Sequence, residues 1–97
     1  MRIYYVYIIS NVHHTVYYTG FTNDIFRRTT EHRDKIRKSF TAKYNCCKLL
    51  YYEEFDDAAD ALYREQLIKR YKRTFKENLI NSMNPEWEDL FEQFLVN

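Results

Sequence analysis

The sequence predicts an α+β domain in which a small three-stranded antiparallel sheet is flanked by helices, in the order ββαβααα. Two runs of β-branched and aromatic residues, 3–9 and 15–19, stand on either side of a polar break, which is typical of a β-hairpin. A third such run follows at 47–55. Because the chain has 97 residues and no internal repeat or linker, we expect residues 1–97 to form one domain.

The alternation of side chains along the predicted hairpin places tyrosines on one face. Tyr7 shares a face with Tyr5 in the first strand, and Tyr18 lies on one face of the second strand, so Tyr7 and Tyr18 are neighbours if the register allows. The single glycine of the chain, Gly20, closes the second run. We expect it where a Cβ would not fit, at a tight strand end or against a ligand.

Capping patterns predict the helices. Asp57, with Asp60 three residues on, marks an N-cap, and Thr74 to Glu77 has the form of a capping box. Asn84-Pro85 is typical of an N-cap followed by proline at the first helical position. The expected helices are residues 24–36, 58–72, 75–82 and a short last helix that runs through Phe94, with a basic loop at 37–46.

The first predicted helix carries polar groups beside a thin apolar stripe. Arg28 and His32 are four residues apart and therefore share a face. Together with Tyr7, Tyr18 and Gly20 they suit a phosphate, because a guanidinium binds phosphate oxygens in pairs and a tyrosine hydroxyl can accept a proton once a neighbour lowers its pKa. Taken singly, each of these residue types is more often a packing or solvated residue.

Glu65 falls within the apolar stripe of the helix predicted over 58–72. A carboxylate at such a place can bind a hard cation, since Mg²⁺ takes one or two carboxylates and keeps several waters. The alternative is a salt bridge to Arg64, to Lys69 or to an arginine of the first helix. No zinc-ligand spacing, nucleotide-binding glycine loop or GxSxG motif is present in the sequence.

Composition and charge exclude several classes of protein. Hydrophobic residues make up 45% and charged residues 30%, which excludes fibrous and disordered chains. No run of 18 apolar residues and no cleavable leader is present, so we expect a cytoplasmic protein that does not enter a membrane. The adjacent Cys46 and Cys47 are expected to be reduced packing residues.

The net charge of +1 hides strong segregation of charge along the chain. Residues 27–48 hold eight basic and two acidic residues, and residues 64–76 hold six basic and one acidic. If these two basic blocks meet in the fold, they form a surface for a polyanion. The alternative is that each is a solvated helix face paired with an acidic block, of which the chain has one at 53–60 and one at 77–92.

The motifs in their order resemble the GIY-YIG nuclease superfamily. Tyr5-Val6-Tyr7, ten residues, and Tyr18-Thr19-Gly20 are variants of its two named tripeptides, and residues 21–28 and Glu31-His32 follow at the expected spacing. The similarity continues through residues 43–45, 49–53, 64–65 and 84–87 and so spans nearly the whole chain. It is greatest to the small single-domain members related to the N-terminal nuclease domain of the bacterial excision-repair endonuclease.

This resemblance implies a Mg²⁺-dependent endonuclease (Mn²⁺ being the alternative ion) that hydrolyses phosphodiester bonds. Tyr7 and Tyr18 match the tyrosines of the two motifs, and Arg28 matches the catalytic arginine. The remaining matches are His32 at a helper position, Glu65 at the metal-binding glutamate, and Gly20 and Asn84 at supporting positions. In the implied reaction Arg28 binds the scissile phosphate, Tyr18 takes a proton from the attacking water and Tyr7 orients that water.

The partner implied by the resemblance is nucleic acid, DNA rather than RNA, with structure-selective binding and a link to DNA repair or recombination. We expect a monomer or weak dimer, and a protein partner as a source of specificity. The basic residues expected to contact phosphates are Arg27, Arg33, Lys35, Lys43, Lys69, Arg70 and Arg73.

Two other functions remain open on the sequence. Phe21 follows Gly20 at a position where some active relatives have a lysine or a small polar residue, which favours a noncatalytic nucleic-acid-binding module that keeps the fold. The second alternative is a protein-interaction domain that uses the tyrosine-rich and acidic surfaces.

Overall fold

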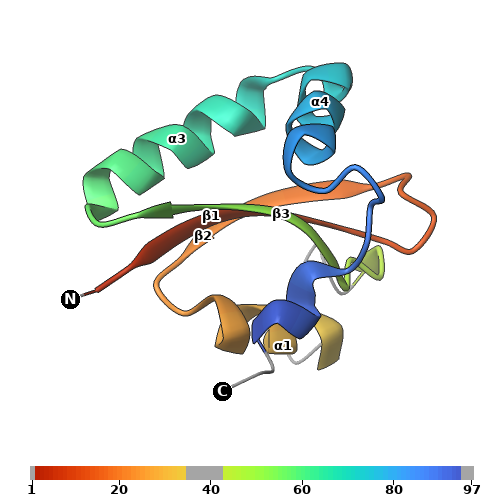
Figure 1. Ribbon diagram of the computed structural model, residues 1–97, viewed down its shortest axis with the longest axis horizontal. Helices are drawn as coiled ribbons and strands as arrows, with labels where there is room; N and C mark the ends of the chain where they lie inside the picture. The colour runs from red at the N-terminus through yellow and green to blue at the C-terminus, as the bar shows by residue number, and fades with distance from the viewer. Residues whose placement is uncertain (1, 35–42, 95–97) are drawn as a thin grey trace.

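A computed structural model of the chain describes residues 2–34 and 43–94. Its strands are β1 (Tyr4–Ser10), β2 (Tyr17–Thr22) and β3 (Lys48–Phe55). Its helices are α1 (Ile25–Asp34), α3 (Ala58–Arg70), α4 (Arg73–Met83) and the 3-10 helix η1 (Leu90–Phe94). Figure 1 shows a three-layer arrangement, with α3 and α4 on one side of the sheet and α1 and η1 on the other.

The three strands form one antiparallel sheet in the order β2-β1-β3, which confirms the predicted α+β class. The hairpin register pairs Tyr7 with Gly20 and Ile9 with Tyr18. A register shift between Ile8 and Ile9 interrupts the pairing of β1 with β3. β1 is therefore the central strand, and its residues from Val6 to Ser10 are buried on both faces.

Alternate residues of the sheet supply two separate cores. The side chains of Val6, Ile8 and Leu50 pack with residues of α3 and α4. Those of Tyr7, Ile9 and Leu49 pack with residues of α1 and η1. The side-chain period of two along each strand thus decides that Tyr7 belongs to the α1 layer.

Helix α3 is held at its start and along its length. The carboxylate of Asp57 accepts a hydrogen bond of 2.9 Å from the amide of Ala59, as the N-cap pattern predicts. Arg64 donates from Nε and Nη2 to the two carboxylate oxygens of Glu53 on β3, each at 2.9 Å. This paired contact fixes α3 against the sheet.

The C-terminal part departs from the sequence prediction. Helix α4 begins at Arg73 rather than at residue 75, with Lys72 as its N-cap and no side-chain cap, so the capping box predicted at Thr74 is wrong. Asn84 ends α4 instead of opening a helix, because its side chain turns back to bind the carbonyl of Leu50 at 3.1 Å. The predicted last helix is only the 3-10 turn η1.

The first helix is observed from Ile25 to Asp34, and its predicted last two residues lie outside the described part of the chain. Most of the loop predicted at 37–46 lies there as well. Among residues 2–34 and 43–94, no helix has the length and apolar character needed to cross a bilayer.

Candidate active site

Tyr7 is the centre of the predicted site and is almost fully enclosed. It leaves 2% of its surface exposed and lies across the hairpin from Gly20. A Cβ added to Gly20 would overlap the hydroxyl oxygen and Cζ of Tyr7. Gly20 does not have a positive φ, so it is required for space and not for backbone conformation. The expectation that a Cβ would not fit is confirmed, but Gly20 lies inside β2 and not at its end.

His32 joins the two tyrosines of the motifs. The hydroxyl of Tyr7 and Nε2 of His32 share a hydrogen bond of 3.0 Å, whose direction depends on the imidazole tautomer. The ring centroids of Tyr7 and Tyr18 each lie 5.8 Å from that of His32. Because Tyr18 pairs with Ile9, it is diagonal to Tyr7 and not directly opposite it, and His32 contacts both.

Helix α1 brings His32 and Arg28 to the tyrosines because its start is fixed to the end of β2. The hydroxyl of Thr22 accepts from the amide of Asp24 at 3.1 Å, and the carboxylate of Asp24 accepts from the amide of Arg27 at 3.0 Å. The next turn therefore begins in a defined orientation. Arg28 and His32 then follow on one side of the helix.

Glu31 is a site residue to which sequence reasoning gave no role. Its Oε1 lies 3.6 Å from Nε of Arg28, and both atoms are buried without a hydrogen-bond partner in the described part of the chain. The other oxygen, Oε2, accepts from Nη1 of Arg27 at 3.1 Å. The spacing of three residues between Arg28 and Glu31 is the signal that could have revealed it.

Glu65 belongs to the opposite layer, on α3, where it is 8% exposed. One carboxylate oxygen lies 3.2 Å from Nζ of Lys69, one turn along the same helix. Of the salt bridges proposed from the sequence, the pair with Lys69 is therefore the one formed, whereas Arg64 pairs with Glu53. Since the Lys69 side chain is 48% exposed, this pair adds little stability.

Charges from both layers act on the hydroxyl of Tyr7. Burial is the main reason that the pKa of Tyr7 lies well above its ordinary value of 10; Tyr18, Glu65 and Glu31 raise it further, and Arg28 lowers it. Tyr7 therefore stays protonated at neutral pH. The same interactions place Arg28 and Glu65 within electrostatic reach of one hydroxyl, although they come from opposite sides of the sheet.

The residues present are compatible with a magnesium ion at Glu65. Mg²⁺ commonly binds one or two carboxylates and retains its waters, so a single buried carboxylate is a sufficient anchor. In the described part of the chain no group of three or more His, Cys, Asp or Glu side chains forms a protein cage for a metal. Lys69 would exchange its contact with Glu65 for solvent when a cation binds.

Two other predicted features have positions that the structure makes clear. Asn84 binds backbone atoms of Leu50 and Glu88, so its observed contacts tie the segment after α4 to the sheet. Phe21 stacks on Tyr4, with ring centroids 6.0 Å apart, and packs in the core beneath α3. Its side chain thus lies on the face of the sheet opposite Tyr7.

The basic residues predicted to contact phosphates are divided between the two layers and are mostly paired. Arg27 and Arg33 of α1 form ion pairs with Glu31 and Asp89, at 3.1 Å and 2.5 Å. Lys69 and Arg73 pair with Glu65 and Glu77, Lys43 lies over the ring of Tyr44, Arg70 is exposed, and Lys35 lies outside the described residues. The basic blocks at 27–48 and 64–76 do not merge on one face of the sheet, which favours the alternative of helix faces paired with acidic groups.

Comparison with known proteins places the chain in a family. The sequence profile of the GIY-YIG catalytic domain matches residues 3–78. A UPF0213 protein of Natronomonas pharaonis is 36% identical over 76 residues, covering 78% of this chain and 88% of that protein. A UPF0213 protein of Clostridium perfringens is 33% identical over 85 residues, covering 88% and 90%.

The fold has a counterpart among solved structures. The solution NMR structure of a UPF0213 protein of Bacillus halodurans superposes with a TM-score of 0.57 at 26% identity, and the match covers 90% of this chain and 92% of that one. The catalytic domain that the profile describes points to an endonuclease in general terms. The chain belongs to the GIY-YIG catalytic domain family and resembles its small UPF0213 members.

Proposed function

We propose that this chain is a metal-dependent endonuclease that hydrolyses DNA phosphodiester bonds, with Tyr7, Tyr18, Arg28, His32 and Glu65 as its catalytic residues. The observation that carries the proposal is the convergence on one buried hydroxyl: Tyr7 is hydrogen-bonded to His32, and Arg28 and Glu65 both act on its pKa. A tyrosine, an imidazole, a guanidinium and a carboxylate at one place supply the acid–base and phosphate-binding groups of phosphodiester hydrolysis.

The roles follow from the environment of each group. Tyr7 remains neutral because its pKa is raised, so it acts as a hydrogen-bond donor that orients the attacking water, with His32 as its partner. Tyr18 takes the proton of that water. Arg28 binds the oxygens of the scissile phosphate, and its contact with Glu31 sets the direction of its guanidinium.

In the proposed reaction, the water oxygen forms a bond to phosphorus while the bond from phosphorus to the 3′ oxygen breaks. The 3′ oxygen then takes a proton, which leaves a 3′ hydroxyl and a 5′ phosphate. Glu65 would hold Mg²⁺ or Mn²⁺, and the bound ion would supply positive charge near the departing oxygen. The chain's own residues thus bind the phosphate, orient the water and move the proton.

The proposal extends to a structure-selective activity on DNA, with a cytoplasmic role in repair or recombination. Phosphate contacts carry no sequence information, and most of the basic side chains named above are paired with carboxylates. Both facts favour recognition of DNA shape over recognition of bases along a site.

The test is cleavage of supercoiled plasmid and of branched and single-stranded DNA with Mg²⁺ or Mn²⁺. Arg28→Ala and Glu65→Ala should each slow cleavage about 10²- to 10³-fold, the usual effect of losing a group that stabilises the transition state. The matched controls are Arg2→Ala and Glu86→Ala, which change exposed residues of the same types outside the site. Circular dichroism of each variant shows whether it is folded.

The possible outcomes separate the candidate functions. Wild-type rates in both folded site variants would overturn the proposed nuclease. Equal background in all proteins, with binding that weakens as salt rises, would identify a noncatalytic nucleic-acid-binding module. No affinity for DNA at low salt would instead favour a protein-interaction domain.

A further inference from the structure

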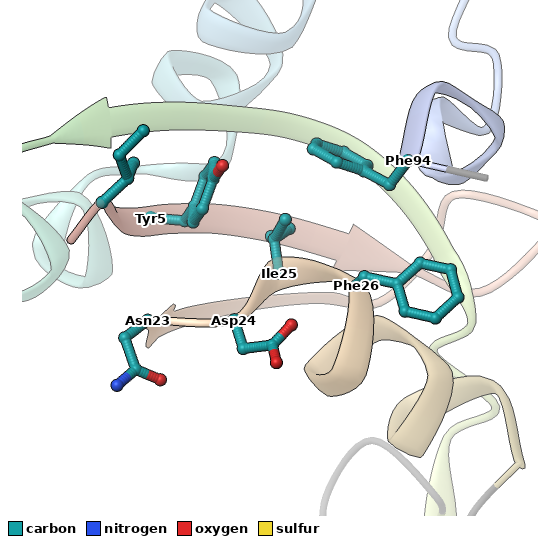
Figure 2. A pocket seen from close by; sticks show the side chains of 7 residues that line it. Tyr5, Asn23, Asp24, Ile25, Phe26 and Phe94 are labelled. Atoms are coloured by element: carbon teal, nitrogen blue, oxygen red, sulfur yellow. The ribbon is translucent and has the colours of Figure 1, made fainter. Parts of the chain in front are cut away.

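A hollow of about 370 Å³ lies at the start of α1, beside the candidate site (Figure 2). Its walls are largely apolar and aromatic, and include Tyr5, Ile25, Phe26 and Phe94. Asn23 and Asp24, on the segment that leads into α1, supply polar groups along it. A cavity of this size with apolar walls and a few polar groups is typical of a small-ligand site.

The position of this hollow relates it to the phosphate-binding residues. Tyr5 is two residues before Tyr7 on the same face of β1, roughly 7 Å along the strand. On the helix side, the amide of Arg28 donates to the carbonyl of Asp24 at 3.0 Å, so one turn of α1 separates the hollow from Arg28. A strand whose phosphate lies at Arg28 therefore has an adjacent nucleotide within reach of the hollow.

The chemistry of the walls favours a base over a second phosphate. The carboxylate of Asp24 already accepts from the first turn of α1, at the amide of Arg27, and a phosphate there would meet its negative charge. Phe26 is 44% exposed and stacks on Phe91, with ring centroids 5.5 Å apart, so its aromatic surface is accessible. The exposed amide of Asn23 can donate to or accept from the edge of any base.

We propose that this hollow binds the nucleobase next to the scissile phosphate, stacked on the aromatic surface of Phe26 with Asn23 at its polar edge. The inference rests on the proposed function, because the same site delivers the DNA strand. Stacking on an aromatic side chain tolerates every base, which agrees with recognition of DNA without sequence preference.

The test measures equilibrium binding by fluorescence anisotropy in EDTA, so that no strand is cut. Two short labelled single strands of equal length are compared, one with bases and one with abasic sugars throughout. Phe26→Ala should weaken binding of the strand with bases about 5- to 150-fold, the loss that corresponds to stacking of one base, and should leave binding of the abasic strand unchanged.

Phe75→Ala is the matched control, since Phe75 on α4 is 48% exposed and lies outside the hollow. It should leave the affinity of wild type for both strands unchanged. Phe26→Leu keeps an apolar side chain over Phe91 but no aromatic face, and should weaken binding in the same way even if Phe26→Ala is poorly folded.

The outcomes distinguish this inference from the nuclease proposal. Equal effects of the Phe26 and Phe75 variants, or equal loss on both strands, would overturn the base site while leaving cleavage unaffected. Binding that depends on Phe26 in a protein that cuts no DNA with Mg²⁺ or Mn²⁺ would support the base site and overturn the nuclease. No binding of the strand with bases to wild type would overturn the base site.

Discussion

The packing of Gly20 against Tyr7 gives the sharpest prediction. In Gly20→Ala the new Cβ would overlap the hydroxyl of Tyr7, and even Cε1 of that ring would lie 2.9 Å away, well inside the usual 3.5–4.0 Å contact. Because Tyr7 is only 2% exposed, the ring can move only by displacing its neighbours. Such overpacking costs about 1–3 kcal/mol, offset by about 0.5–1 kcal/mol because alanine is better than glycine in a strand.

The expected net loss is about 1–2 kcal/mol in the free energy of unfolding, which corresponds to a fall of about 4–16 °C in Tm for a domain of this size. Urea and thermal unfolding measure it, and the cleavage assay should show a parallel loss because the Tyr7–His32 hydrogen bond is displaced. In a Tyr7→Phe background the nearest overlapping atom is gone, so Gly20→Ala should cost at least about 0.5 kcal/mol less. Wild-type stability and activity for Gly20→Ala would refute the reasoning.

Three further predictions concern buried polar groups. The unfolded chain loses its tyrosine protons near pH 10 while Tyr7 keeps its own, so stability should fall as pH rises above 10, and less steeply in Tyr7→Phe; urea unfolding against pH tests this. Burial raises the pKa of Cys46 to about 11, so a thiol reagent at pH 8 should modify Cys47 first, and Cys47→Ser should lose the fast phase. The buried hydroxyl of Thr19 has no hydrogen-bond partner among described residues, so Thr19→Val should leave stability unchanged or raise it by about 1–3 kcal/mol, and a fall in Tm would contradict this.

Local sequence patterns were sufficient for most of the fold. The alternation along β1 predicted that Tyr5 and Tyr7 share a face, and the spacing of Arg28 and His32 predicted that both lie on one side of α1. Asp57 was recognised as an N-cap because that contact lies within three residues of the chain. These features depend on neighbours in sequence, and so the sequence alone determined them.

Features that depend on contacts between distant segments required the structure. The hairpin register opposes Tyr7 to Gly20 and leaves Tyr18 diagonal, which the composition of the strands does not specify. Asn84 has the sequence context of an N-cap, yet it ends α4 because the carbonyl of Leu50 offers a partner 34 residues away. Tertiary hydrogen bonds of this kind override a local preference.

The candidate site shows the same division. The sequence by itself supplied its residue types and, through the resemblance, the family to which the chain belongs. Only the tertiary structure decided that Glu65 acts on Tyr7 from the opposite layer, that Glu31 lies beside Arg28, and that the basic blocks are separated by the sheet. The physical reason is that the path of the chain through the sheet, and not spacing along it, sets which charges share a low-dielectric environment.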